Sequence, residues 1–235
     1  GLGHNIMFNF YQYIKTYISE LFDKKRIHKQ VRIITINTKL VIYTTAILLF
    51  GGWIFLFIAE FNNTLLAHPT LFGKITNAAF CAVTPRTAGF SVLDFSEMTV
   101  PSLLFIIFLM WVGGSPASTA GGIKTSTIAL ATLNVFSVAR RKSRIEFLGR
   151  RISSDSTSRA FAILSISLMV IGVAIMALLI FEPKDTPLLT VVFECFSAYS
   201  TVGLSLNFTP TLTEPSKYVL IATMFIGRIG MLNLM

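Results

Sequence analysis

The sequence predicts an all-α polytopic membrane protein made of two tandem copies of one helical unit. Of its 235 residues, 53% are hydrophobic and 13% are charged, with a mean hydropathy of +0.69, which is unlike a soluble domain. Residues 40–59, 98–123 and 160–181 contain no charged side chain. Each stretch reaches the roughly 20 residues that a helix needs to cross a hydrocarbon core. A shorter apolar segment follows the first and the third stretch, and these two short segments are alike.

Residues 1–38 are expected to hold the tail of a preceding repeat helix and a basic cytoplasmic linker. The net charge of +9 is concentrated in KKRIHKQVR at 24–32 and ARRKSRIEFLGRR at 139–151, and both clusters border long apolar stretches. Basic residues beside membrane spans mark cytoplasmic loops. Their placement favours anionic lipid over nucleic acid as the partner of these side chains.

The short segments predict helices that enter the membrane and return to the same side. Residues 75–91 read ITNAAFCAVTPRTAGFS, and a helical part of about 11 residues spans about 16 Å, half a membrane. Residues 188–205 (LLTVVFECFSAYSTVGLS) match them when Gly89 is set on Gly203, 114 positions later. The same offset aligns four further identical pairs: Thr87 and Thr201, Ser91 and Ser205, Cys81 and Cys195, and Gly113 and Gly227. We therefore expect two copies of one unit, at residues 39–145 and 146–235. The last helix of the first copy is expected to be broken by an intramembrane loop, and that of the second copy to be truncated.

The turns TAGFS and TVGLS predict a cation site. Irregular backbone at membrane depth is tolerated only where protein buries it or where it lines water. Glycine in each turn allows successive carbonyls to point one way and replace the hydration shell of a cation, and the negative ends of the short helices point to the same place. The residues assigned to this site are Thr87, Ala88, Gly89, Phe90, Thr201, Val202, Gly203 and Leu204.

The segment GGSPASTAGGIKT interrupts the second apolar stretch, residues 98–123. It is not a phosphate-binding loop of the form G-x-x-x-x-G-K-[ST], because Ile123 separates Gly122 from Lys124 and no strand-like run precedes it. Its small residues favour a gate inside a pore below the cation site; a packed helix break is the alternative. The gate residues are Gly113, Gly114, Ser115, Pro116, Ala117, Ser118, Thr119, Ala120, Gly121, Gly122 and Lys124.

Four charged residues in apolar surroundings remain to be assigned. Arg228 lies about 20 Å along the last span and aligns beside Gly114, so we expect it to face the pore as a barrier to cations and to pair with the loop, or else to form a structural ion pair. Lys124 could bind a lipid phosphate, pair with a carboxylate or snorkel to the interface. Glu194 is expected to support the second turn. Arg86 is expected to pair either with Glu194 or with a carboxylate outside this sequence.

Catalytic chemistry is not expected. The two cysteines lie in apolar surroundings without metal-ligand spacing, and the three histidines are scattered. A structural or receptor-like membrane protein would not need a half-length helix repeated together with its turn. Both ends of the chain fall in apolar sequence, so we expect the chain to be part of a longer protein.

The turns TPRTAGFS and AYSTVGLS, the loop GGSPASTAGGIKT and the opening GLGHN together resemble the Trk/Ktr/HKT superfamily of potassium transporters. The resemblance is strongest to its KtrB-type ion-translocating subunits. In that family four M1-P-M2 repeats (helix, re-entrant pore helix, filter, helix) build one pore, and this chain resembles the third and fourth. The resemblance implies K⁺ translocation, Na⁺-dependent in some members, with K⁺ held by filter backbone carbonyls.

The resemblance also implies partners. These are a second copy of the chain in a homodimer, the lipids of a bacterial cell membrane, and a KtrA-like cytoplasmic ring that binds nucleotide, so no cofactor is expected in this subunit. Each turn keeps one glycine, and Phe90 and Leu204 occupy the aromatic position of the T-V-G-Y-G filter of potassium channels. An Na⁺-conducting or weakly selective transporter of the same fold is therefore the alternative.

Overall fold

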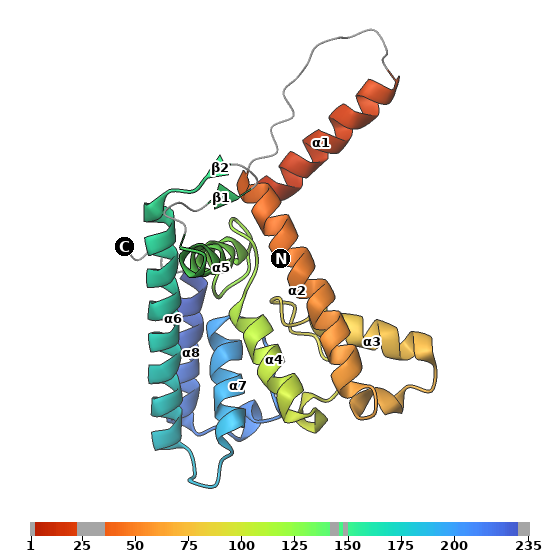
Figure 1. The fold of residues 1–235 in the computed structure, drawn as a ribbon. Helices are drawn as coiled ribbons and strands as arrows, with labels where there is room; N and C mark the ends of the chain where they lie inside the picture. The colour runs from red at the N-terminus through yellow and green to blue at the C-terminus, as the bar shows by residue number, and fades with distance from the viewer. Residues whose placement is uncertain (1–2, 23–35, 142–145, 148–149, 230–235) are drawn as a thin grey trace.

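The computed structural model describes residues 3–22, 36–141, 146–147 and 150–229 (Figure 1). The main helices are α1 (His4–Phe22), α2 (Ile36–Glu60), α3 (Leu71–Val83), α4 (Val100–Trp111), α5 (Thr125–Ala139), α6 (Ser154–Phe181), α7 (Leu188–Tyr199) and α8 (Glu214–Ile229). Three 3₁₀ turns join them: η1 (Thr64–Ala67), η2 (Phe95–Glu97) and η3 (Thr209–Thr211). The strands β1 (Glu146–Phe147) and β2 (Arg150–Arg151) form an antiparallel hairpin.

The hairpin is a small departure from the all-helical prediction. Its two strands lie within the second basic cluster, between α5 and α6. Backbone groups that no helix pairs must find other partners, and here they pair across the hairpin. The first basic cluster, residues 24–32, lies outside the described residues.

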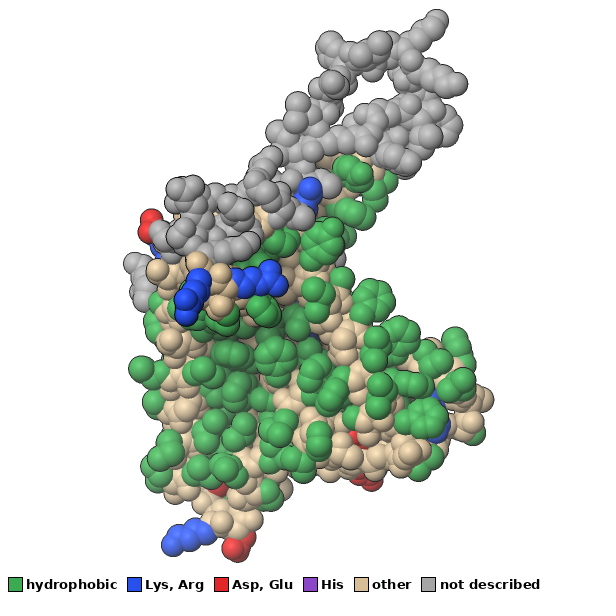
Figure 2. Space-filling view, in the orientation of Figure 1, with side chains coloured by type: hydrophobic (Ala, Val, Ile, Leu, Met, Phe, Trp, Pro, Cys, Tyr) green, Lys and Arg blue, Asp and Glu red, His purple; other side chains and the backbone are tan. Residues whose placement is uncertain are grey.

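Two described helices, α2 and α6, are long and apolar enough to cross a membrane. In the most apolar 18-residue segment of each helix, only 17% (α2) and 22% (α6) is buried. These helices therefore do not form the core of a soluble protein. Exposed apolar side chains also lie along much of the face of the bundle that Figure 2 shows.

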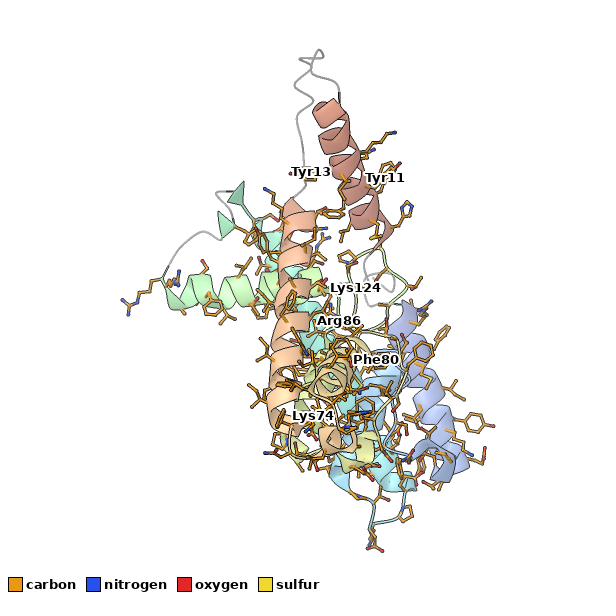
Figure 3. All side chains as sticks on the ribbon, turned by 90° about the vertical axis from the view of Figure 1, so that its right-hand side faces the viewer. Tyr11, Tyr13, Lys74, Phe80, Arg86 and Lys124 are labelled. Carbon is orange, nitrogen blue, oxygen red and sulfur yellow. The ribbon has the colours of Figure 1, made fainter. Side chains whose placement is uncertain are left out.

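The apolar stretch at residues 98–123 does not form one helix, as expected from the segment GGSPASTAGGIKT within it. The helix there ends at Trp111, and the chain resumes helical structure only at Thr125. The glycines and the proline of the intervening segment disfavour helix. The second piece, α5, does not continue the direction of α4 but lies across the end of the bundle (Figures 1 and 3).

The order of long helix, short helix, turn and helix occurs twice along the chain. One hydrophobic cluster is centred on α2, α3 and α4 and includes Phe193, and a second cluster lies among α6, α7 and α8. The fully buried ring of Phe193 on α7 lies 6.3 Å, centroid to centroid, from Phe95. The two halves therefore share a core, and α4 packs against α7.

In each half, a glutamate at the end of the long helix binds the residue at the start of the last helix. Glu60 at the end of α2 accepts hydrogen bonds from Thr99 N (3.0 Å) and Oγ1 (2.8 Å), and Thr99 caps α4. Glu182, just after α6, accepts bonds of 2.9 Å from N and Oγ1 of Thr213, at the start of α8. Burial alone would raise the pKa of Glu182, but the hydrogen bonds from Ser216 and Thr213 lower it, so its carboxylate remains a charged cap.

These caps extend the repeat beyond the pairs used above. The pattern T-x-P-S occurs at residues 99–102 and again at residues 213–216, with the same offset of 114. In each copy the threonine hydroxyl also lies within hydrogen-bonding distance of the serine hydroxyl, Ser102 or Ser216. This sequence signal therefore marks the same structural joint twice.

Candidate functional site

The two T-x-G-x-S turns share an unusual backbone. Thr87 and Gly89 have φ values of 63° and 72°, and Thr201 and Gly203 have φ values of 52° and 91°. Left-handed backbone is rare for a β-branched residue such as threonine and is a sign of constraint at a functional site. Positive φ values thus recur at equivalent positions of the two halves.

The turns lie side by side although 114 positions separate them in sequence. A Cβ added to Gly89 would overlap the carbonyl oxygen of Val202, and the nearest atom to a Cβ on Gly203 is the Cα of Gly89, at 3.9 Å. The structure therefore brings the two predicted filter segments together at their glycines. Only glycine permits the approach at position 89.

Hydrogen bonds to the preceding helices and their ends hold both turns. Gly89 N donates to Thr84 O (3.3 Å), and Thr84 Oγ1 donates to Phe90 O (2.5 Å). In the second turn, Val202 N donates to Ser197 O (2.9 Å).

The side chains of the two turns differ in exposure. Val202 and Leu204 are buried in the core shared with α2–α4, whereas Phe90 is 70% exposed and Ala88 is exposed. Within the described part of the chain, nothing covers the Phe90 ring as the core covers Leu204.

Glu194 lies on α7, beside the segment that follows the second turn. Its carboxylate accepts hydrogen bonds from Ser205 Oγ and from Thr209 Oγ1 (3.1 Å), and the residue is only 4% exposed. Ser205 Oγ in turn accepts a bond from Phe208 N (3.3 Å). Glu194 thus fixes the segment that follows TVGL.

Arg86 does not pair with Glu194. Among the described residues no salt bridge joins the two, and Arg86 Nη1 is buried without a hydrogen-bond partner. Arg86 is 8% exposed at the end of α3, directly before the first turn. The expected pairing of Arg86 with Glu194 is therefore not seen among the described residues, and pairing with a carboxylate outside this sequence stays a prediction.

The glycine-rich loop between α4 and α5 lies directly against the second turn. Gly121 N donates to Thr201 Oγ1 at 3.2 Å, and a Cβ on Gly122 would lie only 3.0 Å from Ser200 Oγ. A backbone bridge between Val112 and Ile123 closes the base of the loop. Ser200 is a contact that the sequence analysis missed, because a buried serine beside a glycine 78 positions earlier leaves no sequence pattern.

Two basic side chains bind carbonyls of the loop. Arg228 Nη1 donates to Thr119 O, and Lys124 Nζ donates to Ala120 O at 2.5 Å. For Lys124 a loop carbonyl is a partner that was not among the three expected fates. Carbonyls that no helix satisfies are available here as acceptors. Figure 3 shows Arg86 and Lys124 at successive heights along the bundle, with Lys124 nearer α1.

The structure thus places the predicted filter turns, loop residues and Arg228 in one continuous region. At the other face Asp94 accepts a bond from Ser96 N (2.9 Å) and faces Asn207 Nδ2 (3.4 Å), so the segments after the two turns also meet. The hydrogen bonds from Ser96 lower the pKa of the exposed Asp94 carboxyl. Among the described residues no group of three or more His, Cys, Asp or Glu could hold a metal ion.

The sequence profile of the TrkH family, described as a cation transport protein, matches residues 2–235. The chain belongs to this family. The match confirms the resemblance to Trk and Ktr transporters, which are membrane cation transporters rather than enzymes.

Curated relatives of this TrkH-family chain carry transport names. It is 38% identical over 88% of its length to the potassium/sodium uptake protein NtpJ of Enterococcus hirae, covering 46% of that protein. It is 38% identical over 91% of its length to the Ktr system potassium uptake protein B of Bacillus subtilis, covering 47%. The chain therefore spans about half the length of the curated relatives it matches.

A solved structure shows the same fold. The potassium transporter TrkH from Vibrio parahaemolyticus superposes with a TM-score of 0.60 at 21% sequence identity, over 84% of this TrkH-family chain and 43% of that one. At this identity the likeness supports the fold, and the roles of individual residues depend on the geometry described above.

Proposed function

We propose that this chain forms half of a pore that translocates K⁺ across the bacterial cell membrane as a multi-pass subunit. Residues 87–90 and 201–204 act as two filter segments whose backbone carbonyls replace water around K⁺. The two halves are consecutive M1-P-M2 repeats, with α3 and α7 as re-entrant pore helices. The observation that carries the proposal is the equal left-handed backbone at Thr87 and Thr201, brought together across the chain.

The loop between α4 and α5 is proposed to be the gate. It lies against Thr201 through Gly121, and Arg228 and Lys124 hold its carbonyls. Two fixed positive charges next to an ion path oppose cations. A packed helix break would not need a charged donor directed at the loop from α8.

Weak selectivity is the second candidate. The relative from Enterococcus hirae is named as a potassium/sodium uptake protein, and each filter segment has a single glycine. On this candidate the same path carries Na⁺ as well as K⁺.

The proposed assembly has further parts. Relatives are named as components of a Ktr system, which supports a second, regulatory component. We propose that this component is a KtrA-like cytoplasmic ring that binds nucleotide. We also propose that the pore subunit forms a homodimer. The exposed apolar faces of α2 and α6 are available to lipid or to a second copy. K⁺ is the transported ion, and the subunit itself is proposed to need no cofactor.

Cation flux in liposomes tests the proposal. The full-length protein that carries this chain is reconstituted, and K⁺ and Na⁺ uptake are measured against empty liposomes. We expect K⁺ flux well above background, and larger than Na⁺ flux. Equal fluxes would favour the weakly selective candidate, and flux no greater than in empty liposomes for both ions would contradict both.

A further inference from the structure

The first turn of α1 binds the tip of the loop between α4 and α5. Gly3 N donates a hydrogen bond to Ser115 Oγ, and His4 N donates to Ala117 O at 3.4 Å. Ser115 is 1% exposed, so its hydroxyl has no alternative partner in water. The contact uses backbone N–H groups that a helix leaves unpaired at its start.

Gly3 allows this contact because it has no side chain. A Cβ at this position would overlap the carbonyl oxygen of Pro116 and lie about 3.0 Å from the carbonyl carbon of Ala117. Gly3 is buried. Any larger residue there must displace either α1 or the loop tip.

We propose that the start of α1 is an anchor of the gate, and that Gly3 is the residue that positions the loop tip in its closed position. The inference rests on the proposed function, since it assigns a regulatory contact to the same gate. The loop then has three anchors on other elements: Thr201 in the second filter turn, Arg228 on α8 and the first turn of α1. The first two hold the part of the loop that returns toward α5, and α1 holds its tip.

The loop tip has room to move when this anchor is released. A cleft of about 470 Å³ lies next to Pro116 and Ala117. The other residues that line it belong to α1 and to the start of α2: Ile6, Phe8, Asn9, Asn37 and Thr38. A shift of the tip toward the cleft would not displace a buried core residue of either hydrophobic cluster.

The orientation of α1 would allow it to transmit a displacement to the loop tip. The helix extends away from the bundle (Figure 1), and Met7, Phe8, Phe10 and Tyr11 on it are each at least half exposed. Its far end leads into the basic segment at residues 24–32, which is expected on the cytoplasmic side. A displacement of α1 from that side would therefore be transmitted to the tip of the gate.

The test compares two glycine substitutions in the full-length protein, reconstituted in liposomes without regulator. Gly3→Ala adds a methyl group against the loop tip. The matched control, Gly172→Ala on α6, adds one where nothing lies within 4 Å. We expect Gly3→Ala to raise basal K⁺ flux about fivefold, the factor that corresponds to one lost hydrogen bond, with the K⁺/Na⁺ flux ratio unchanged.

A disulfide cross-link provides a second test if Gly3→Ala does not yield folded protein. His4→Cys with Ala117→Cys joins two exposed positions whose backbones are already hydrogen-bonded. We expect oxidation to suppress K⁺ flux and reduction to restore it.

Each result has a distinct meaning. If the wild type carries K⁺ but Gly3→Ala behaves like Gly172→Ala, or if oxidation of the cysteine pair leaves flux unchanged, the anchor is overturned while the pore remains. If the wild type carries no K⁺, the proposed function itself fails.

Discussion

Replacing Gly89 with alanine is expected to abolish selective K⁺ flux. Residue 89 needs left-handed backbone, which costs an L-residue about 1–2 kcal/mol, and its Cβ would overlap the carbonyl oxygen of Val202 in the neighbouring turn. The substitution therefore moves a carbonyl that we propose to bind the ion. The measurement is K⁺ and Na⁺ flux in liposomes, with protein amount normalised.

Gly203 provides an informative comparison. It has the same left-handed backbone, but the nearest atom to an added Cβ is 3.9 Å away. Gly203→Ser is thus expected to reduce the K⁺/Na⁺ flux ratio through backbone strain alone, by less than Gly89→Ala. Gly51→Ala, in open space on α2, should behave as wild type. A wild-type flux ratio in Gly89→Ala would contradict the assignment of these turns as a filter.

Replacing Arg228 with glutamine is expected to raise basal cation flux by about one order of magnitude. The substitution removes a positive charge and the donor to Thr119 O, and a hydrogen bond from a charged group contributes about 1.5–3 kcal/mol. Flux per reconstituted protein, measured without regulator, reports the change. Arg228→Lys keeps the charge and should restore most of the block.

The pair of variants also separates a gate from a structural role. If Arg228 only stabilises the fold, glutamine would reduce the yield of folded protein while flux per protein stays at the wild-type level. That result would remove Arg228 from the gate.

Much of the fold could be predicted because its signals are local or periodic. Apolar length located α2 and α6, and the identities at an offset of 114 identified two copies of one unit. The T-x-P-S pattern at residues 99–102 and 213–216 was also visible in the sequence. Its structural role could not be predicted, because Glu60 and Glu182, which bind the two copies of the pattern, are not separated by 114 positions.

The contacts of the site were harder to predict because they join backbone to side chain over long separations. Gly3 and Ser115 are 112 positions apart, and Arg228 and Thr119 are 109 apart. The loop partner of Lys124 depends on which carbonyls the helix break leaves unpaired, which composition does not specify. The break at residues 112–124 was expected, by contrast, because glycine and proline cluster there in the sequence.

The central claim is that the paired turns bind the transported ion through their carbonyls. The most direct test is a crystal structure of the full-length protein with Tl⁺ in place of K⁺, in which anomalous scattering locates the ion. The account predicts anomalous density between residues 87–90 and 201–204, and its loss when Na⁺ replaces Tl⁺. Density elsewhere in the molecule, with none at these turns, would contradict it.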